Sequence, residues 1–492
     1  MANFVIGSGG GGKGGGGGGS TAKDNLESTQ FGRVLDLLSE GEIGGLVDGK
    51  KSIFLNNTPL QNANGTENFK NVDYATRIGE SVQEVIPLTQ NTSQVKSTGL
   101  GTITTNTAGV KTITNSDVDA VKVTIDIPQL QKITDDGDIE GTELKLEIAV
   151  QYSGGSYTTL ISGDSNVIAS ENGKIKGRTG DLYQKEYLIN LNKTLQAAGN
   201  VNIKVTRLTA DSTNPKLVNA FQWNTYTEII YDERTYPNCA LVGMKIDAEQ
   251  FSSIPKRTYL IKGKTVKIPH NATVRSDGSL QYSGTFNGTL GAAEVTNDPA
   301  WILFDLLTSS RYGLGTDPVT NAGYLAEADL DKFSFYAASQ YCSTQITYTL
   351  DGSTVTEPRF ACNVNIQTAQ EAYNVINQLS SVFRAQAFWQ AGSVSLTQDS
   401  PQDTSYLFSI ANVLDPGFTY QTASLKNRVT VAVVKYFDNN LRDYTYEEVE
   451  DTAGNITKYG RIVKNVDAFA CTSRGQAQRL GKWLIYTENN ER

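Results

Sequence analysis

Short runs in which apolar and polar residues alternate are the feature that most constrains how this chain can fold. Three such runs are VKVTIDI (121–127), LKLEIAVQY (144–152) and VNIKVTRL (201–208). A period of two places the apolar side chains on one face of a β-strand. Gly154-Gly155, which joins the second run to SYTTLI, predicts a hairpin. Together these strands predict a small β-sandwich, inserted over residues 111–209 between segments of different character.

Strand signals continue on both sides of this segment. KSIFLNNTPLQ (51–61) predicts a strand with a polar turn, and residues 223–270 are strand-like. Further along, AQAFWQAGSVSLTQ (385–398) predicts a hairpin and NRVTVAVVKYF (427–437) another strand. Sheet is therefore expected in every part of the chain.

Four segments favour helices. Asp298-Pro299 opens the first, because proline is well placed at the first helical position. Residues 328–342 form the second. Residues 368–383 form the third, with a capping box from Thr368 to Glu371. The last is capped by Ser473 and Gln476 and runs almost to Arg492.

The chain begins with a glycine-rich segment. Residues 1–21 predict a flexible tail, because GSGGGGKGGGGGGS (7–20) contains nothing to bury. Gly7 to Lys13 fits the GxxxxGK pattern of a phosphate loop, but Gly14 follows where Ser or Thr is required. A flexible tail is the favoured interpretation. A short helix is expected next, with these apolar positions: Leu26, Phe31, Val34, Leu35 and Leu38.

Composition agrees with a multidomain protein in which sheet dominates. At 492 residues, and about 150 residues per domain, three or four domains are expected. The 46 glycines and the many Thr, Ser, Val and Tyr residues favour sheet and turns over helical bundles. The predicted fold class is α+β, β-rich and multidomain. A net charge of -9 without any Lys/Arg run argues against nucleic-acid binding, including sequence-specific binding.

The four cysteines are too far apart for CxxC chemistry, and we expect buried free thiols typical of a reducing cytoplasm. They are Cys239, Cys342, Cys362 and Cys471. No run approaches the ~18 apolar residues of a membrane span. MANFVIGSGG lacks the features of a secretory signal. Synthesis in a cytoplasm is the expectation.

One acidic segment is close to a calcium loop. Asp136, Asp138 and Glu140 are followed by Gly141 and, at EF-hand distance, by Glu147. However, ELKLEIAV alternates as a strand and no helices flank the loop. A solvated acidic β-turn is therefore favoured, and the four residues remain a calcium candidate only.

Catalytic constellations are thin, and we predict neither a catalytic residue nor a cofactor. His270 is the only histidine, and a surface loop is its simplest interpretation. Two further groups of residues could serve a glycosidase or a carbohydrate groove, although solvated acids and sheet packing explain them equally well. They are Glu447, Glu448, Glu450 and Asp451, and Tyr226, Tyr231 and Tyr236.

Five segments resemble the lambda-type tip attachment proteins, also called host specificity protein J, in their N-terminal part. TEII, YPN-x-ALVG, RYG-x-G and CTSRGQA are the most specific strings within these segments. The blocks, in family order, are AKDNLESTQFGRVLDLLSEGEIGGLVDG (22–49), NTYTEIIYDERTYPNCALVGMKIDAEQF (224–251), WILFDLLTSSRYGLG (301–315), EPRFACNVNIQTAQEA (357–372) and DAFACTSRGQAQRLGKWLIYTE (467–488).

The resemblance implies a non-enzymatic baseplate-hub-like protein in a siphophage virion, at the distal tip of a long non-contractile tail. Family members are homotrimers whose paired β-barrels close the tail tube and adapt hexameric rings to a three-fold tip. The implied partners are other tail-tip and tail-tube proteins and the tape measure protein. A host surface receptor would be bound through parts absent here, before genome ejection. Assembly would take place in the bacterial cytoplasm.

The domain division that follows has five parts. They are a tail (1–21), a first hub region (22–110 with 210–295), the inserted sandwich (111–209), an α/β hub region (296–384), and second-barrel strands with a C-terminal helix (385–492). The stop at Arg492 falls where the family continues, which predicts a fragment or a tip divided between chains. Two alternatives stay open: a tail-associated glycan-degrading enzyme, and a carbohydrate-binding module centred on residues 117–208.

Overall fold

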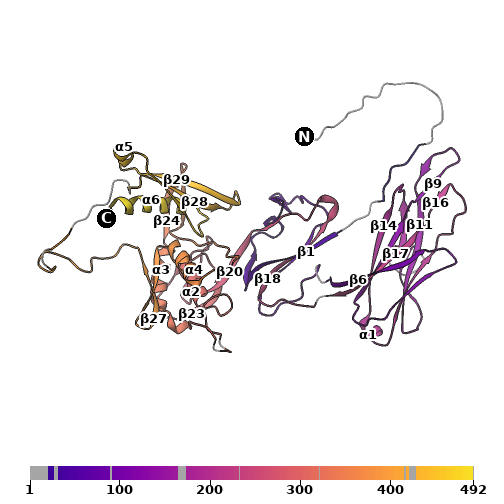
Figure 1. Ribbon diagram of the computed structural model, residues 1–492, viewed down its shortest axis with the longest axis horizontal. Coiled ribbons are helices and arrows are strands. Elements are labelled where there is room, and N and C mark those ends of the chain that lie inside the picture. Colours follow the sequence, from indigo (N-terminus) through magenta and orange to yellow (C-terminus); the bar gives the residue numbers. More distant parts are fainter. Residues whose placement is uncertain are drawn as a thin grey trace, which may run out of the picture.

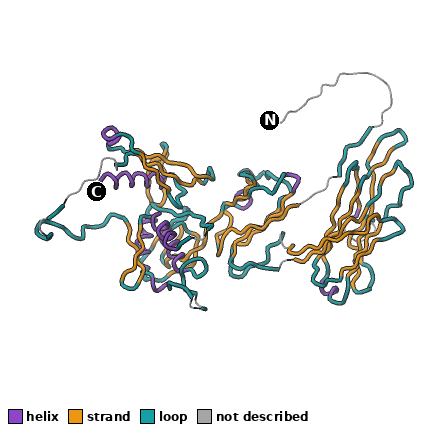
Figure 2. The backbone as a smooth tube through the Cα atoms, in the orientation of Figure 1, coloured by secondary structure: helices purple, strands orange, loops and turns teal. Residues whose placement is uncertain are grey.

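The computed structural model has three blocks in a row, which Figure 1 shows along its long axis. A β-sandwich lies at one end, a small sheet unit lies in the middle, and the helices lie at the other end. Figure 2 shows that the longer helices are confined to this last block. The residues that the structure describes are 20–26, 31–88, 91–164, 173–231, 233–317, 319–320, 322–368, 370–414, 417–419 and 428–490.

The sandwich consists of two antiparallel sheets. One has the order β12-β11-β15-β7 with β13 also on β11, and the other has the order β14-β8-β17-β6. Trp223 and Phe221 are fully buried between them, together with the alternating apolar residues of the strands. The strands are β6 (Asn91–Thr102), β7 (Gly109–Ile113), β8 (Ala120–Ile127), β11 (Thr142–Tyr152), β12 (Thr158–Ser162), β13 (Lys174–Gly177), β14 (Tyr183–Asn190), β15 (Val201–Arg207) and β17 (Gln222–Tyr231).

Smaller elements complete the sandwich. A three-stranded sheet covers one end, and a single helical turn lies near the other (Figure 1). These are β9 (Gln131–Ile133), β10 (Ile139–Glu140), β16 (Leu217–Val218) and α1 (Lys193–Gln196). The strands expected at 121–127, 144–152 and 201–208 and the hairpin at Gly154-Gly155 are thereby confirmed.

The middle unit is built from short strands around a core that includes Ile53, Leu55 and Val242. Its three sheets have the orders β1-β18-β5, β19-β3-β4 and β2-β20-β23. Strand β20 pairs with β2 through its first half and with β23 through its second half. The strands are β1 (Phe31–Glu40), β2 (Ile43–Leu46), β3 (Ile53–Leu55), β4 (Thr58–Pro59), β5 (Asp73–Ile78), β18 (Cys239–Asp247), β19 (Arg257–Tyr259), β20 (Ile261–Pro269) and β23 (Leu290–Val295).

The helical unit packs three helices around Trp301 and Phe335, and Val266 and Ile268 of β20 belong to the same core. Strand β20 is therefore shared between the middle and helical units. The elements are β21 (Ala272–Val274), β22 (Leu280–Tyr282), α2 (Pro299–Thr308), α3 (Lys332–Cys342), β24 (Gln345–Leu350), β25 (Ser353–Pro358), α4 (Ala372–Val382), β26 (Ala385–Gln390) and β27 (Ser393–Gln398).

The C-terminal unit is a three-stranded sheet of order β29-β28-β30 with α6 packed on one face. Strand β30 runs parallel to β28, and β29 runs antiparallel to it. The elements are β28 (Val431–Asp438), β29 (Asp443–Glu450), α5 (Asn455–Tyr459), β30 (Val463–Asp467) and α6 (Arg474–Asn490). The β-rich α+β fold class is confirmed by these four units.

The helix expected to include Phe31 to Leu38 is wrong. These residues form strand β1, in which every second residue from Gly32 to Leu38 is more buried than its neighbours. Strand β1 pairs with β18 from Phe31 to Glu40, with one irregularity. Long-range pairing therefore satisfies the backbone and outweighs the weak local helix signal.

The capping box of the third helix is also wrong. Helix α4 begins at Ala372, and Glu371 is itself the residue that caps it. Because Glu371 has an extended backbone and makes no side-chain cap hydrogen bond, Thr368 lies outside the helix. The other expected helices are confirmed, with Asp298 capping α2 and Ser473 Oγ accepting from the Gln476 N–H at the start of α6.

The β-barrels implied by the resemblance are not found. The strands of the described ranges form open sheets, because no ladder joins β1-β18-β5 to β2-β20-β23 or closes β29-β28-β30. The flexible tail and the phosphate-loop pattern at Gly7–Lys13 lie in residues 1–19, outside the described residues. Ser20 and Thr21 lie along the sandwich, where Thr21 bridges to Ile139 of β10.

Candidate interaction surfaces and joints

The acidic residues of the calcium candidate lie on and near the β9–β10 hairpin. Asp136 is in its turn, and the carboxylate of Asp138 accepts a hydrogen bond of 2.5 Å from the backbone N–H of Ser20. Glu140 belongs to β10, and Glu147 lies within β11. Throughout the described ranges, no three His, Cys, Asp or Glu side chains gather as metal ligands. What the structure assigns to this turn is a contact with the N-terminal segment.

His270 follows the end of β20 and is exposed. Its Nδ1 lies 3.1 Å from the carbonyl oxygen of Thr289, and its ring stacks on that of Phe286 with centroids 6.1 Å apart. The surface-loop interpretation agrees with this position. Three buried thiols, those of Cys342, Cys362 and Cys471, have pKa values raised by burial, to about 11 for Cys471.

The carboxylates near the end of β29 are held by arginines. Glu447 pairs with Arg474 at 2.7 Å, whereas Glu448 and Glu450 both pair with Arg461. Ion pairing holds these side chains in place and explains them without a catalytic role. The fourth acid of this group, Asp451, accepts a hydrogen bond from the backbone N–H of Ala453.

The three tyrosines singled out from the sequence do not form one groove. Tyr226 packs against the sandwich core, edge-on to Trp223. The Tyr231 hydroxyl donates to Asn190 at 2.9 Å. Tyr236 lies in the next loop with a positive φ of 50°. Sheet packing therefore accounts for Tyr226, and the other two are dispersed.

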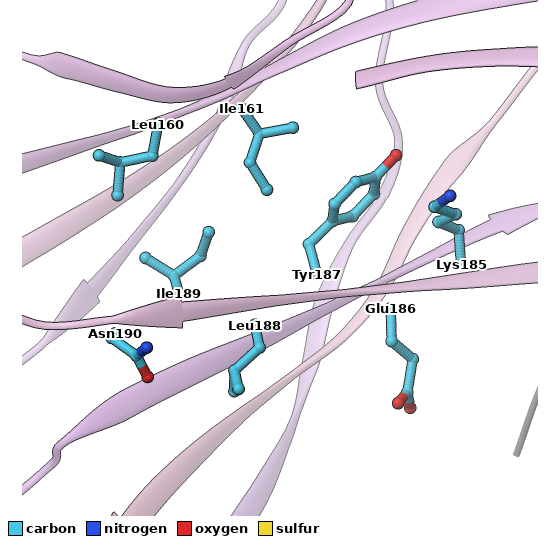
Figure 3. Close-up of a pocket in the computed structure, with 8 residues that line it drawn as sticks. All are labelled: Leu160, Ile161, Lys185, Glu186, Tyr187, Leu188, Ile189 and Asn190. Atoms are coloured by element: carbon cyan, nitrogen blue, oxygen red, sulfur yellow. The ribbon is translucent and has the colours of Figure 1, made fainter. Parts of the chain in front are cut away.

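A groove of about 350 Å³ lies along one open side of the sandwich (Figure 3). It is lined by Leu160 and Ile161 of β12 and by residues 185–190 of β14, the edge strands of the two sheets. In Figure 3, Tyr187 and Ile189 point toward β12, whereas Leu188 points to the other side. Because this lining is part of the sandwich core, the groove is a gap between two sheet edges and holds no catalytic array.

The RYG-x-G string forms a joint between the middle and helical units. Arg311, just after α2, pairs with Glu40 at the end of β1, with 2.7 Å between Nε and Oε1. Lys264 of β20 donates to the backbone carbonyl of Glu40, and its ammonium group lies over the ring of Tyr312. Burial lowers the pKa of Lys264, although Asp305 and Glu40 oppose this effect. A strand end, a helix end and a shared strand thus meet in one polar cluster.

The glycines of this string are required by close backbone contacts. A Cβ atom on Gly313 would lie 1.8 Å from the carbonyl oxygen of Leu306, and one on Gly315 would lie 1.9 Å from that of Thr308. Both carbonyls belong to the end of α2, so a side chain would have to displace helix backbone. The loop can fold back onto α2 only where Cβ is missing.

The YPN string lies in the connection between the sandwich and the middle unit. The buried amide of Gln83 donates to the carbonyl oxygens of Tyr236 (2.6 Å) and Cys239 (3.0 Å). The N–H of Asn238 donates to Glu80, and its carbonyl accepts from the N–H of Gly41. One glutamine therefore satisfies a loop whose backbone turns away from regular pairing.

The CTSRGQA string joins the C-terminal unit to hairpin β24–β25. Arg474 pairs with Glu447 of β29 and with Asp351 in the hairpin turn. Gly475 lies against the hairpin, because a Cβ atom there would overlap the Tyr348 hydroxyl. The start of α6 is thereby fixed between two sheets.

Two further side chains of α6 strengthen this joint. The Gln476 amide exchanges hydrogen bonds with both backbone groups of Ala361, at 3.0 and 3.1 Å. Arg479 pairs with Glu357 of β25 at 2.6 Å. All three strings that suggested the resemblance therefore lie where separate units meet.

The helical unit has a buried polar centre at Asp298, which is 1% exposed. Its carboxylate accepts from the backbone N–H groups of Ala300 and Trp301 and from the hydroxyls of Ser339 (2.6 Å) and Ser343 (3.0 Å). Burial raises the pKa of Asp298 to about 6, although these four donors lower it. The site fixes α2 against α3 and is structural.

Sequence reasoning missed the exposed apolar residues of the C-terminal half. Trp389 at the end of β26, Tyr444 and Tyr446 on β29, and the segment after β27 all present large apolar side chains to solvent. The only sequence signal is an apolar run, SYLFSIANVL (405–414), that has neither helical nor strand periodicity. Such residues on a folded protein mark contact surfaces.

Among the described residues, no helix is long and apolar enough to cross a membrane.

Comparison with known proteins identifies two segments and nearly the whole chain. Residues 94–232 match a family model described as the FNIII-A domain of tip attachment protein J, and residues 371–492 match one described as "Putative phage tail protein". Tip attachment protein J of Escherichia phage SECphi27 is 32% identical over 490 residues, which are 99% of this chain and 38% of that protein. Its namesake from Escherichia phage SECphi4 is 30% identical over 94% of this chain and 38% of the relative. The chain thus spans about two fifths of the length of these relatives. The resemblance inferred from the sequence is confirmed.

Proposed function

On the premise that this chain is homologous to tip attachment protein J over nearly its whole length, we propose that it is a structural component of a siphophage tail tip. Three copies would form a hub that closes the tail tube and adapts hexameric tail rings to a three-fold tip. The observation that carries this proposal is the match to relatives of that name over 99% of the chain.

The positions of the three family strings support a mechanical role. A hub must transmit force between its units, and such a role needs rigid joints more than tuned catalytic groups. Glu40, Arg311 and Lys264 at one joint, and Arg474 at another, fix neighbouring units through charged contacts. Non-enzymatic function is therefore part of the proposal.

The remaining features of the proposal concern place and partners. The chain would be made in the bacterial host cytoplasm and assembled into the virion with tail-tube, tail-tip and tape measure proteins. Host receptor binding and the trigger for genome ejection would belong to regions of the relatives outside the matched segment. The sandwich would decorate the outside of the hub, as an inserted domain.

Light scattering on the purified chain at several concentrations tests the central point. A mass three times that of the 53.4 kDa chain is the expected result. Gold-labelled antibodies against the chain should also mark the distal end of the tail in phage particles. A stable monomer would contradict a self-sufficient three-fold hub, and labelling along the tube or on the capsid would contradict the tail-tip position.

A further inference from the structure

Residues 400–414, here called the arm, leave the helical unit after β27 and project away from the body of the protein (Figure 1). They form no helix or strand. Five large apolar side chains of the arm are exposed, to an extent typical of an unfolded chain. They are Tyr406 (61%), Leu407 (75%), Phe408 (66%), Ile410 (84%) and Leu414 (90%).

The arm is ordered locally but is not covered by the rest of the chain. The Asn412 side chain accepts from the N–H of Ser409 at 2.7 Å and donates to the carbonyl of Leu407 at 2.8 Å. The rings of Tyr406 and Phe408 meet edge-on, with centroids 4.9 Å apart. Every hydrogen bond recorded for residues 400–414 joins two residues between 400 and 417.

The base of the arm is fixed. The N–H of Asp399 donates to the carbonyl of Arg384, and its carboxylate accepts from the indole of Trp483 at 2.8 Å. A fixed base directs the arm outward, so its apolar side chains meet solvent unless another molecule covers them. Burying them would contribute about 25 cal/mol for each Å² removed from water. Exposed apolar groups on this scale indicate a docking element.

The chain also has an acceptor suited to such a segment. Hairpin β26–β27 contains no charged residue, and the outer edge of β26 pairs with no strand in the described residues. The other edge is used, because Val394 of β27 bridges to Leu330 and accepts from the N–H of Asp331. Phe388 and Trp389 are exposed on β26. Open, uncharged strand edges pair readily with extended peptides.

The other open edge in this half is less suitable. Strand β29 exposes Tyr444 and Tyr446, but it also has the acids Asp443, Glu448 and Glu450 on its exposed positions. Charges on an edge strand oppose pairing with a further strand. The arm has an acid of its own, Asp403, and no basic residue. Charge therefore favours β26 as the acceptor.

We propose that the arm docks on the free edge of β26 in a second copy of this chain, with its apolar side chains against Phe388 and Trp389. The contact is heterologous, since arm and acceptor are different surfaces, and repetition around an axis would close a ring. This inference rests on the proposed hub and supplies a means by which its copies hold together.

Cross-linking between two different variants tests the contact directly. In a Cys239→Ser background, chains with Leu407→Cys and chains with Trp389→Cys are produced in the same cells and treated with a short bis-maleimide. A covalent dimer containing both variants is expected. Leu407→Cys combined with Leu441→Cys, an exposed residue away from β26, is the matched control. Absence of the mixed dimer, or an equal yield with the control, would overturn the proposal.

Assembly of the full chain separates this inference from the hub itself. Leu407→Ser, Phe408→Ser and Ile410→Ser together should raise the concentration for half-dissociation at least about tenfold in light scattering. The matched control replaces three exposed apolar residues elsewhere, Val82, Ile254 and Leu441, by Ser and should assemble as the wild type does.

Each outcome of the assembly experiment decides one of the two claims. If the arm variant stays trimeric, arm docking falls and the hub stands. If wild type forms an arm-dependent oligomer of another size, arm docking stands and the three-fold hub falls. A wild-type monomer at every concentration would overturn both.

Discussion

The sandwich and the helical end of the molecule bury their apolar residues in opposite ways. Between its two sheets the sandwich encloses nearly all alternating apolar positions of its strands, including Trp223 at 0% exposure. The helical end has a comparable core around Trp301 but leaves Trp389 and the arm in solvent. The sandwich is complete as a single chain, whereas the other end has surfaces that await a partner. A domain inserted for decoration and a unit used for assembly differ in this respect.

Two tryptophans give the largest expected contrast. Trp223→Ala removes a fully buried side chain and should lower the free energy of unfolding of the sandwich by about 3–5 kcal/mol. Trp389→Ala alters an exposed side chain and should change the free energy of unfolding of the monomer by less than about 0.5 kcal/mol. Urea denaturation followed by circular dichroism measures both. Equal losses would refute the distinction between a closed and an open region.

Two helix caps sharpen the comparison within the helical end. Asp298→Ala removes the cap of α2 and leaves the buried hydroxyls of Ser339 and Ser343 without their acceptor, so a loss of about 2–3 kcal/mol is expected. The control, Asp331→Ala, removes the half-buried cap of α3 and should cost about 1 kcal/mol. Thermal unfolding of both variants decides. A cost for Asp298→Ala no larger than that of the control would show that the polar centre contributes little.

A joint can be tested with a pair of glycines. Gly313→Ala should destabilise by roughly 1–3 kcal/mol, because the new methyl group overlaps the backbone of α2. Gly263→Ala, in β20, meets no atom within 4 Å and serves as the control. Limited proteolysis should also show earlier cleavage after α2 in the first variant alone. Identical melting and cleavage would mean that the joint tolerates displacement.

The smallest expected effect concerns pH. The carboxylate of Asp36 on β1 accepts from Arg257 (2.5 and 2.8 Å) and from the Tyr259 hydroxyl, and the Arg257 hydrogen bond lowers the pKa of Asp36. A lowered folded-state pKa stabilises the protein above pH 3.8, and this contribution is lost as pH falls through the folded value. Asp36→Asn should therefore be less stable than wild type at pH 5 and should approach it below pH 3. A difference that does not change with pH would exclude this linkage.

Several elements could be predicted because their signals are local. The 121–127, 144–152 and 201–208 runs became β8, β11 and β15, and Asp298-Pro299 became the capped start of α2. Other elements could not be predicted this way. Phe31–Glu40 has apolar residues at spacings that suit a helix, and only its partner β18 makes it a strand. Element type is settled by local sequence where periodicity is strong and by pairing where it is weak.

The surfaces relevant to function followed the same division. The RYG-x-G and CTSRGQA strings could be recognised as text, but their physical task required the coordinates. Arg311 is 271 residues from Glu40, and Gln476 is 115 residues from Ala361. No local pattern reports such distant contacts. The acidic turn at Asp136 to Glu140 shows the converse, since a motif-like spacing gathered no cluster of metal ligands within the described residues.

The sequence by itself determined that this protein is β-rich, contains an alternating-strand sandwich and resembles tail-tip proteins, because side-chain periodicity and motif text are properties of neighbouring residues. Only the tertiary structure decided that β1 is a strand, that the motif strings lie at joints, and that residues 400–414 stand exposed beside an open edge of the same fold. Pairing, burial and exposure depend on residues far apart in the chain, and their free energies exceed those of weak local preferences.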